Sequence, residues 1–119
     1  MQWYNKPQGD PNKKGNKMIS TKKCKITHDE LIAKWESLFT DEHGDPTLTC
    51  LEIPETWYPL IDTLCSQIHN HLSKSQNYDS FYVVQIKEKF GGLRFYINCY
   101  DATIEGMVRM AEAYSYNID

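Results

Sequence analysis

The residues of this chain best suited to chemistry lie close together between positions 87 and 96. They combine cations, aromatic rings and adjacent glycines, and they are Lys87, Lys89, Phe90, Gly91, Gly92, Arg94 and Tyr96. An arginine guanidinium can hold a phosphate through two parallel hydrogen bonds, and lysine ammonium groups add point charges. An aromatic ring offers a stacking surface for a base, and a glycine pair exposes backbone N–H groups to an anion. We therefore predict that these seven residues bind a small anionic, nucleotide-like ligand.

The glycine pair predicts the element that positions these side chains. Two apolar-rich runs of strand length flank Gly91 and Gly92, and glycine reaches positive φ without steric cost. The pattern predicts a β-hairpin in which the two glycines form a tight turn. In that register Lys89 lies directly opposite Arg94, and like charges in a cross-strand pair destabilise a sheet. A bound phosphate would compensate them, and ordinary ion pairs with Glu88 or with carboxylates of the helices are the alternative.

The same register separates the hairpin into two faces. The predicted apolar face consists of Val84, Ile86, Phe90, Leu93, Phe95 and Ile97. The predicted polar face consists of Gln85, Lys87, Lys89, Arg94, Tyr96 and Asn98. A two-stranded hairpin is marginally stable alone, so we expect helices to cover its apolar face. The polar face would then be open to solvent or to another subunit.

A first helix is expected well before the hairpin. Thr27 and Glu30 have the spacing of a capping box, which predicts that the helix begins at His28. Apolar residues then recur at helical spacing as far as Phe39, and an acidic run with a glycine and a proline ends the pattern.

Two further helices flank the hairpin in the sequence. A turn at residues 54–59 leads into the earlier one, because apolar residues follow the helical period from there and proline is tolerated in a first turn. Asp101 is a suitable N-cap for the later one. Residues 47–53 favour either one extra short strand or an extended segment. The predicted fold class is therefore α+β: a two-layer domain in which about three helices cover a small, hairpin-centred sheet in the order α-α-β-β-α.

Charge is distributed unevenly along the chain. Residues 1–25 contain seven lysines and one aspartate, for a net charge of +6, whereas the other 94 residues contain six basic and fifteen acidic side chains, for −9. DNA or RNA binding needs a wide basic footprint, and this acidic domain would repel a polyanion. A small anion needs only a focused basic patch, so nucleic acid is not the expected partner.

The domain organisation follows from length and composition. Residues 1–22 are polar, cationic and interrupted by proline and glycine, which predicts a flexible basic N-terminal arm. Trp3 and Tyr4 are unusual in a spacer, so docking of the arm onto its own or a neighbouring subunit is the alternative. Residues 23–119 form one expected α+β domain. The sequence has no apolar run of membrane-spanning length and no signal-peptide pattern, so we expect no membrane association.

No pattern of metal-binding or catalytic residues stands out. The four cysteines are widely spaced, at Cys24, Cys50, Cys65 and Cys99, and we expect them to be reduced thiols. Cys65 and His69 would share a helix face as half of a metal site, without a second half. The motifs of nucleophilic triads, metalloproteases and phosphate-binding loops are missing. We expect no cofactor, no metal and no catalytic residue, and a binding protein is favoured over an enzyme.

Two segments carry a resemblance to a known group of proteins. Residues 87–96, with the sequence Lys-Glu-Lys-Phe-Gly-Gly-Leu-Arg-Phe-Tyr, resemble the hairpin signature of a family of small, mostly uncharacterised bacteriophage and bacterial proteins. Residues 57–65 resemble the helix that precedes this hairpin in the family, and the similarity covers residues 51–115. Many relatives continue into a Cys-x-x-Cys-Gly metal-binding tail, which residues 116–119 do not contain.

The resemblance implies a viral accessory protein that works in the host cytoplasm. By analogy with phage proteins of similar size, the expected role is anti-defence: sequestering a cyclic nucleotide immune signal without cleaving it. The alternative is a protein-protein interaction module that inhibits a host protein directly, for which the hairpin edges could accept a partner strand. A homo-oligomer is also expected, because a second copy could cover the open face of the sheet.

Overall fold

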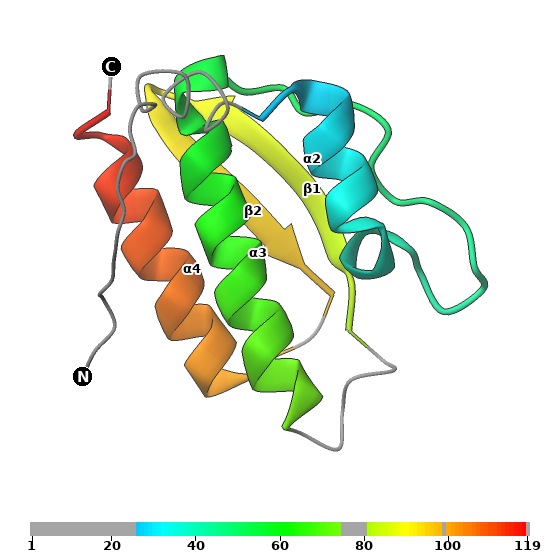
Figure 1. Ribbon diagram of the computed structural model, residues 1–119. Coiled ribbons are helices and arrows are strands. Elements are labelled where there is room, and N and C mark those ends of the chain that lie inside the picture. The colour runs from blue at the N-terminus through cyan, green and yellow to red at the C-terminus, as the bar shows by residue number, and fades with distance from the viewer. Residues whose placement is uncertain (1–25, 75–80, 99, 119) are drawn as a thin grey trace, which may run out of the picture.

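Three helices lie on one face of a two-stranded antiparallel sheet in the computed structural model of the protein (Figure 1). The structure describes residues 26–74, 81–98 and 100–118. The elements are, in chain order, α2 (His28–Lys34), η1 (Glu36–Phe39), η2 (Glu55–Trp57), α3 (Tyr58–Ser73), β1 (Val83–Lys89), β2 (Gly92–Ile97) and α4 (Ala102–Ser115). The predicted α+β fold and its α-α-β-β-α order are confirmed. The predicted arm, residues 1–22, and the predicted start of the domain at residue 23 lie outside the described residues.

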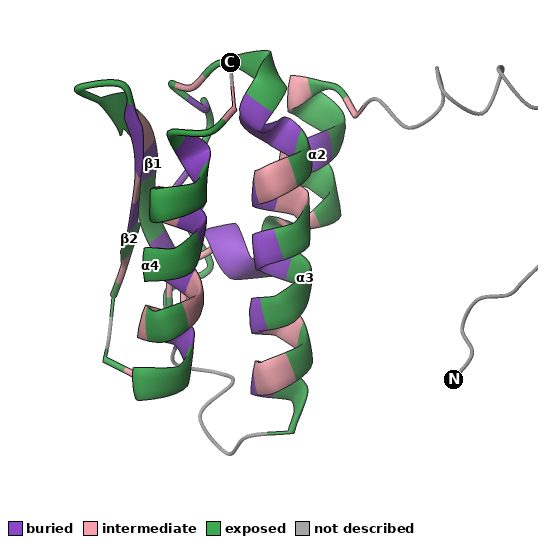
Figure 2. Ribbon diagram, turned by 90° about the vertical axis from the view of Figure 1, so that its left-hand side faces the viewer, coloured by how far each residue is buried: buried purple, intermediate pink, exposed green. Residues whose placement is uncertain are grey.

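The core lies between the helical layer and the hairpin. Figure 2 shows the hairpin at the left, α4 next to it and α3 further to the right, with buried residues on the sides of α3 and α4 that face into the molecule. The core includes Ile61 and Ile68 of α3, Ile86 and Phe95 of the hairpin, and Ile104 of α4, each exposed by 3% or less. None of the described helices is both long and apolar enough to cross a bilayer.

Helix α2 begins at the predicted residue and has the predicted cap. The Thr27 hydroxyl accepts a hydrogen bond from the Glu30 N–H (3.2 Å), and the Glu30 carboxylate accepts one from the Thr27 N–H (3.0 Å). This reciprocal pair satisfies two N–H groups that the first turn of a helix leaves without partners.

The end of α2 differs from the prediction. The apolar spacing predicts a helix as far as Phe39, but α2 stops at Lys34 and Trp35 leaves helical geometry at φ −111° and ψ 28°. The Trp35 indole donates a hydrogen bond from Nε1 to Asp62 Oδ1 of α3 (2.8 Å), and this tertiary contact fixes where the ring lies. The 3₁₀ turn η1 follows and buries Phe39 in the core.

Helix α3 follows the predicted turn at residues 54–59. The face that it buries carries Tyr58, Ile61, Leu64, Cys65, Ile68 and Leu72, which are spaced at the helical period. Burial raises the pKa of the Cys65 thiol far above its ordinary value, so this thiol stays protonated and behaves as an apolar core group. The described part of the chain contains no group of three histidine, cysteine or acidic side chains that could hold a metal ion.

Helix α4 has the predicted N-cap. One carboxylate oxygen of Asp101 accepts hydrogen bonds from the N–H groups of Thr103 (2.9 Å) and Ile104 (3.1 Å), and the other lies 3.2 Å from His71 Nε2 of α3. The bond from the Ile104 N–H is the main cause that lowers the pKa of Asp101, and His71 and the Thr103 N–H lower it further. The cap therefore ties the start of α4 to the last turn of α3.

Replacing Asp101 by alanine should lower the free energy of unfolding by about 0.5–2 kcal/mol, because the first turn of α4 loses its cap. Asparagine caps about as well as aspartate, so Asp101→Asn should retain most of that stability and remove only the charge. The pKa of Asp101 is lower in the folded state than in the unfolded state. The charge of Asp101 therefore stabilises the fold above the unfolded-state pKa, and this stability is lost as the pH falls through the folded-state pKa. Thermal unfolding of wild type and Asp101→Asn should thus differ near neutral pH and converge in acid. A difference that persists in acid would contradict the charge contribution.

The register of the hairpin differs from the prediction. The turn residues are Phe90 and Gly91, at φ 57° and 83°, and Gly92 is the first residue of β2, paired with Lys89. Lys87 is therefore opposite Arg94, whereas the sequence pattern predicts Lys89 there. Phe90 adopts the left-handed conformation that was expected of a glycine, and this makes Gly92 available for a role in β2.

The assignment of side chains to the two faces of the hairpin is largely correct in spite of the wrong register. Moving the turn by one residue shifts each cross-strand partner by two positions, and side chains alternate with a period of two, so they keep their faces. Two residues do not follow the prediction. An irregularity between Val83 and Gln85 buries Val83 in the core and leaves Val84 45% exposed. Phe90 occupies the turn and is 84% exposed, so it does not belong to the apolar face.

The edges of the hairpin are covered by other parts of the chain. On the β2 side, the Leu93 N–H donates to Ser115 Oγ (2.9 Å) and the Phe95 N–H donates to Glu112 Oε2 (3.0 Å), so α4 side chains occupy these groups. On the β1 side, the Glu88 N–H donates to the Glu52 carbonyl (3.1 Å). Residues 47–53 form no strand: Glu52 makes an isolated bridge to Lys87 of β1, and the Thr47 hydroxyl donates to the Val83 carbonyl (2.6 Å), so the extra short strand is absent there.

Candidate functional site

The candidate site lies on the outer face of the hairpin, the face that no described helix covers (Figure 2). The cross-strand pairs on this face are Gln85 with Tyr96, Lys87 with Arg94 and Lys89 with Gly92. Five of the seven predicted site residues therefore share one face. The other two, Phe90 and Gly91, form the turn at its end, where Lys89 Nζ lies 5.7 Å from the centre of the Phe90 ring.

Arg94 is held in place by its neighbours. Its Nη1 donates a hydrogen bond to the Leu93 carbonyl (2.9 Å), and its guanidinium also hydrogen bonds the Tyr116 side chain. The bond to Tyr116 is the main cause that raises the pKa of Arg94, and the nearby Glu112 and Tyr96 raise it further. Arg94 is thus a permanently charged, oriented cation.

Tyr116 is a site residue that the sequence analysis missed. It follows the last turn of α4, and its ring covers Gly92, where a Cβ would overlap the ring carbons and the hydroxyl of Tyr116. Gly92 therefore lets the Tyr116 ring lie against β2 and reach Arg94. The sequence did contain one sign of this contact. The turn needs only Gly91, so the second glycine, Gly92, had to serve another purpose.

The cations of the outer face form no ion pair with a carboxylate among the described residues, and Glu112 acts on Arg94 only from beyond ion-pair distance. No ion pair there involves Lys87, Lys89 or Arg94. The Glu88 carboxylate, which the sequence offered as a neutralising group, instead accepts a hydrogen bond from the Gly91 N–H (2.7 Å). The destabilising cross-strand pair of cations is thus real, with Lys87 in place of Lys89.

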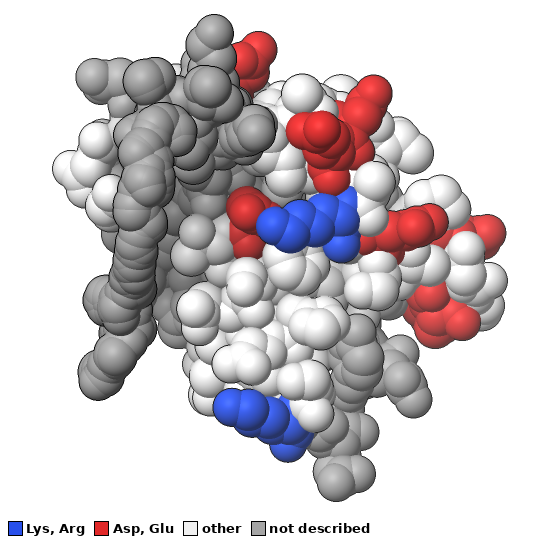
Figure 3. All heavy atoms as spheres, viewed as in Figure 1, with Lys and Arg blue, Asp and Glu red and all other residues white. Residues whose placement is uncertain are grey.

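The helical side of the molecule carries a group of acidic side chains. Figure 3 views the helical layer, where Asp and Glu side chains gather over α2 and the loop that follows it. The three cations of the outer face lie away from this group, although Glu88 of β1 and Glu112 beside β2 are also at the hairpin. A compact anion that contacts only the cations is therefore favoured over a large one.

Two of the four histidines, His28 and His71, have structural roles. His28 Nε2 accepts a hydrogen bond from the Leu51 N–H (2.9 Å), while its Nδ1 lies 3.0 Å from Asp29 Oδ1. His71 bonds the N-cap Asp101. The outer face itself offers lysine, arginine, tyrosine and glutamine side chains, which suit binding more than proton transfer.

A hollow of about 620 Å³ adjoins the site at the turn. Its lining includes Gly91 of the turn together with Glu52, Glu88 and Trp57. Its two carboxylates disfavour an anion, so an anionic ligand would bind on the open outer face. Comparison of the chain with protein-family models, with curated proteins and with solved structures found no match, and the resemblance to the phage family stays a prediction.

Proposed function

We propose that the protein binds and sequesters a small phosphorylated ligand, such as a cyclic nucleotide immune signal, on the outer face of its hairpin. The observation that carries this proposal is the direct pairing of Lys87 with Arg94, two cations that form no ion pair with a carboxylate among the described residues. Such a pair costs stability in the free protein, and a phosphate between the two side chains would turn that cost into an attraction.

The surrounding residues supply the other contacts that a nucleotide needs. Lys89 follows Lys87 on the same face about 7 Å further along the strand, so the two lysines can contact different anionic groups of one ligand. Tyr96 is 41% exposed and follows Arg94 on the same face of β2, where it offers a ring for stacking on a base. Phe90, at the turn, offers a second exposed ring.

Sequestration without cleavage fits the chemistry of these side chains. None of the proposed contacts comes from a nucleophile paired with a base, which cleavage of a phosphodiester would need. The family resemblance adds the biological setting: a bacteriophage accessory protein that counters host defence in the host cytoplasm. The expectation that no cofactor, metal or catalytic residue takes part belongs to this proposal.

The proposal is tested by calorimetry against a panel of cyclic and linear nucleotides, with wild type beside Arg94→Ala. Loss of a charge-assisted bidentate contact should weaken binding roughly ten- to a hundredfold. Arg109→Ala is the matched control, because Arg109 is 79% exposed on α4 and its only described ion pair, with Glu105, spans 4.0 Å. It should bind like wild type. Ligand recovered intact after denaturation supports sequestration, altered ligand indicates an enzyme, and no binding of any nucleotide contradicts the proposal.

A protein partner is the second candidate, and the exposed aromatic and methionine side chains favour it. Large apolar side chains exposed by more than half are Phe90, Tyr100, Met110, Tyr114 and Tyr116. Aromatic, methionine and arginine residues are enriched at the centres of protein interfaces. Direct inhibition of a host protein would use some of these exposed side chains, without a nucleotide.

Self-association through the outer face stays a prediction. A two-fold axis there would bring Lys87 and Arg94 of two copies together. We therefore expect the two copies to associate with higher affinity when an anion lies between these cations. Light scattering with and without added ligand measures this, and a strict monomer under both conditions would contradict it.

A further inference from the structure

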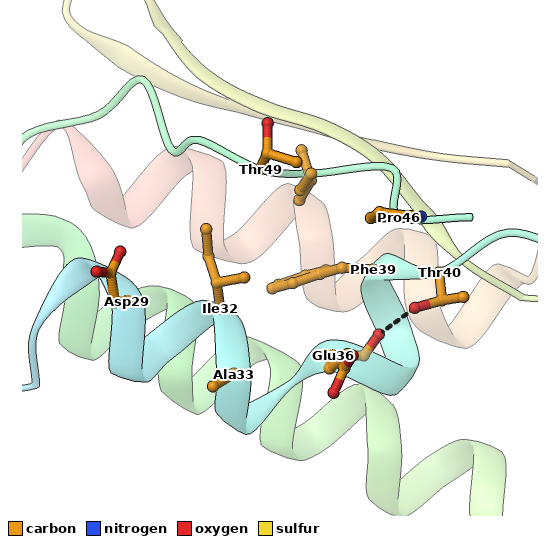
Figure 4. A pocket seen from close by; sticks show the side chains of 9 residues that line it. Asp29, Ile32, Ala33, Glu36, Phe39, Thr40, Pro46 and Thr49 are labelled. Atoms are coloured by element: carbon orange, nitrogen blue, oxygen red, sulfur yellow. Dashed lines mark hydrogen bonds between the residues drawn. The ribbon is translucent and has the colours of Figure 1, made fainter. Parts of the chain in front are cut away.

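A hollow of about 410 Å³ lies between α2 and the chain that returns past it, on the acidic side of the molecule. Figure 4 shows Ile32 of α2 and Phe39 of η1 pointing into it, below the segment that carries Pro46 and Thr49. Leu48 of that segment also lines it. The hollow is thus mostly apolar inside.

Two of the residues that line this hollow carry carboxylates. Asp29 and Glu36 are both exposed and both line the hollow. Asp41, Glu42 and Asp45 follow in the loop after η1. An occupant that fits should therefore combine an apolar or aromatic group with positive charge.

The chain itself contains a segment of that chemistry. Residues 1–25 carry a net charge of +6 and include the adjacent aromatic residues Trp3 and Tyr4. The segment joins the domain at Ile26, three residues before Asp29, which lines the hollow. An extended chain spans about 3.3–3.6 Å per residue, which leaves ample length for Trp3 to reach back.

We propose that residues 1–25 dock on their own domain, with the Trp3 or Tyr4 ring in this hollow and lysines against Asp29 and Glu36. Tethering gives the segment a millimolar effective concentration at the hollow, so weak contacts suffice. The basic segment is also repelled by Lys87 and Arg94 on the outer face, and the acidic side of the molecule attracts it. This inference does not depend on the proposed nucleotide site.

The test uses methyl resonances of the full-length protein in solution. Replacing Trp3 and Tyr4 together by alanine should shift the methyl resonances of Ile32 and Leu48, because an aromatic ring no longer lies near them. Those of Ile104, a buried residue of α4, should stay in place. Gln2→Ala is the matched control within the segment and should change nothing.

A second variant tests the charge contribution without touching the segment. Glu36→Lys should shift the Ile32 and Leu48 resonances in the same direction as the double alanine variant, whereas Glu105→Lys on α4 should not. Unchanged resonances in the double alanine variant would overturn the proposal. Shifts that appear only at high protein concentration would also overturn it, in favour of the segment of a second copy.

Discussion

Replacing Gly92 by alanine is expected to displace the Tyr116 ring, release Arg94 and weaken ligand binding, while the fold is retained. A Cβ at Gly92 would overlap the end of the Tyr116 side chain. That side chain is 56% exposed, so it can swing into solvent at little cost. Arg94 then loses the hydroxyl that orients it, and the pKa of its guanidinium loses the main cause of its rise. We expect at least a fewfold loss in nucleotide affinity, measured by calorimetry, with a shifted Nε–H resonance of Arg94.

Two control variants separate this effect from general strain. Tyr116→Phe keeps the ring and removes the hydroxyl, so it should release Arg94 without any new Cβ. Gly91→Ala places a side chain at φ 83°, which costs about 1–2 kcal/mol of stability, but nothing lies within 4 Å of the added Cβ. It should lower the melting temperature and leave the Arg94 resonance unchanged. Wild-type Arg94 signals in Gly92→Ala would show that Tyr116 does not position this guanidinium.

Replacing Ser115 by alanine is expected to lower the free energy of unfolding by about 1–3 kcal/mol, because a buried donor loses its acceptor. Ser115 is fully buried, and its Oγ accepts from the Leu93 N–H (2.9 Å) while donating to the Glu112 carbonyl (2.6 Å). Chemical denaturation measures the loss.

The matched control is Ser66→Ala, on the exposed surface of α3. Alanine has the higher helix propensity, so this control should be neutral or slightly stabilising. Glu112→Gln tests the neighbouring contact: it keeps an oxygen that can accept from the Phe95 N–H, so it should cost less than Glu112→Ala. If Ser115→Ala unfolds at the same denaturant concentration as Ser66→Ala, the contact to Leu93 contributes nothing.

The parts of the fold that could be predicted are those determined by neighbours in the sequence. The capping box of Thr27 and Glu30 and the N-cap Asp101 act within a single helical turn, and the structure has both. The end of α2 could not be predicted in the same way. It depends on a hydrogen bond between Trp35 and Asp62, which are 27 residues apart.

The hairpin shows the same division. Its existence and the sharing of a face by Lys87, Lys89 and Arg94 follow from local alternation, which a shift of two positions leaves intact. The register of the hairpin does not follow from local alternation, because either of two adjacent glycines could lie in the turn. The contact with Tyr116, 24 positions later, requires a glycine at position 92 and leaves a left-handed Phe90 in the turn. The positioning of Arg94 by Tyr116 could not be predicted either, because it depends on the same contact between residues far apart in the sequence.

The covered edges of the hairpin also bear on how the protein could aggregate. A free strand edge is a template on which further strands add, and this addition leads to domain swapping or to fibrils. Here Ser115 and Glu112 occupy N–H groups of β2, and the Glu52 carbonyl occupies one of β1. Strand addition at β2 would first require α4 to detach. The rate of fibril nucleation from the native protein should therefore follow the stability of α4 against local unfolding, and not protein concentration alone.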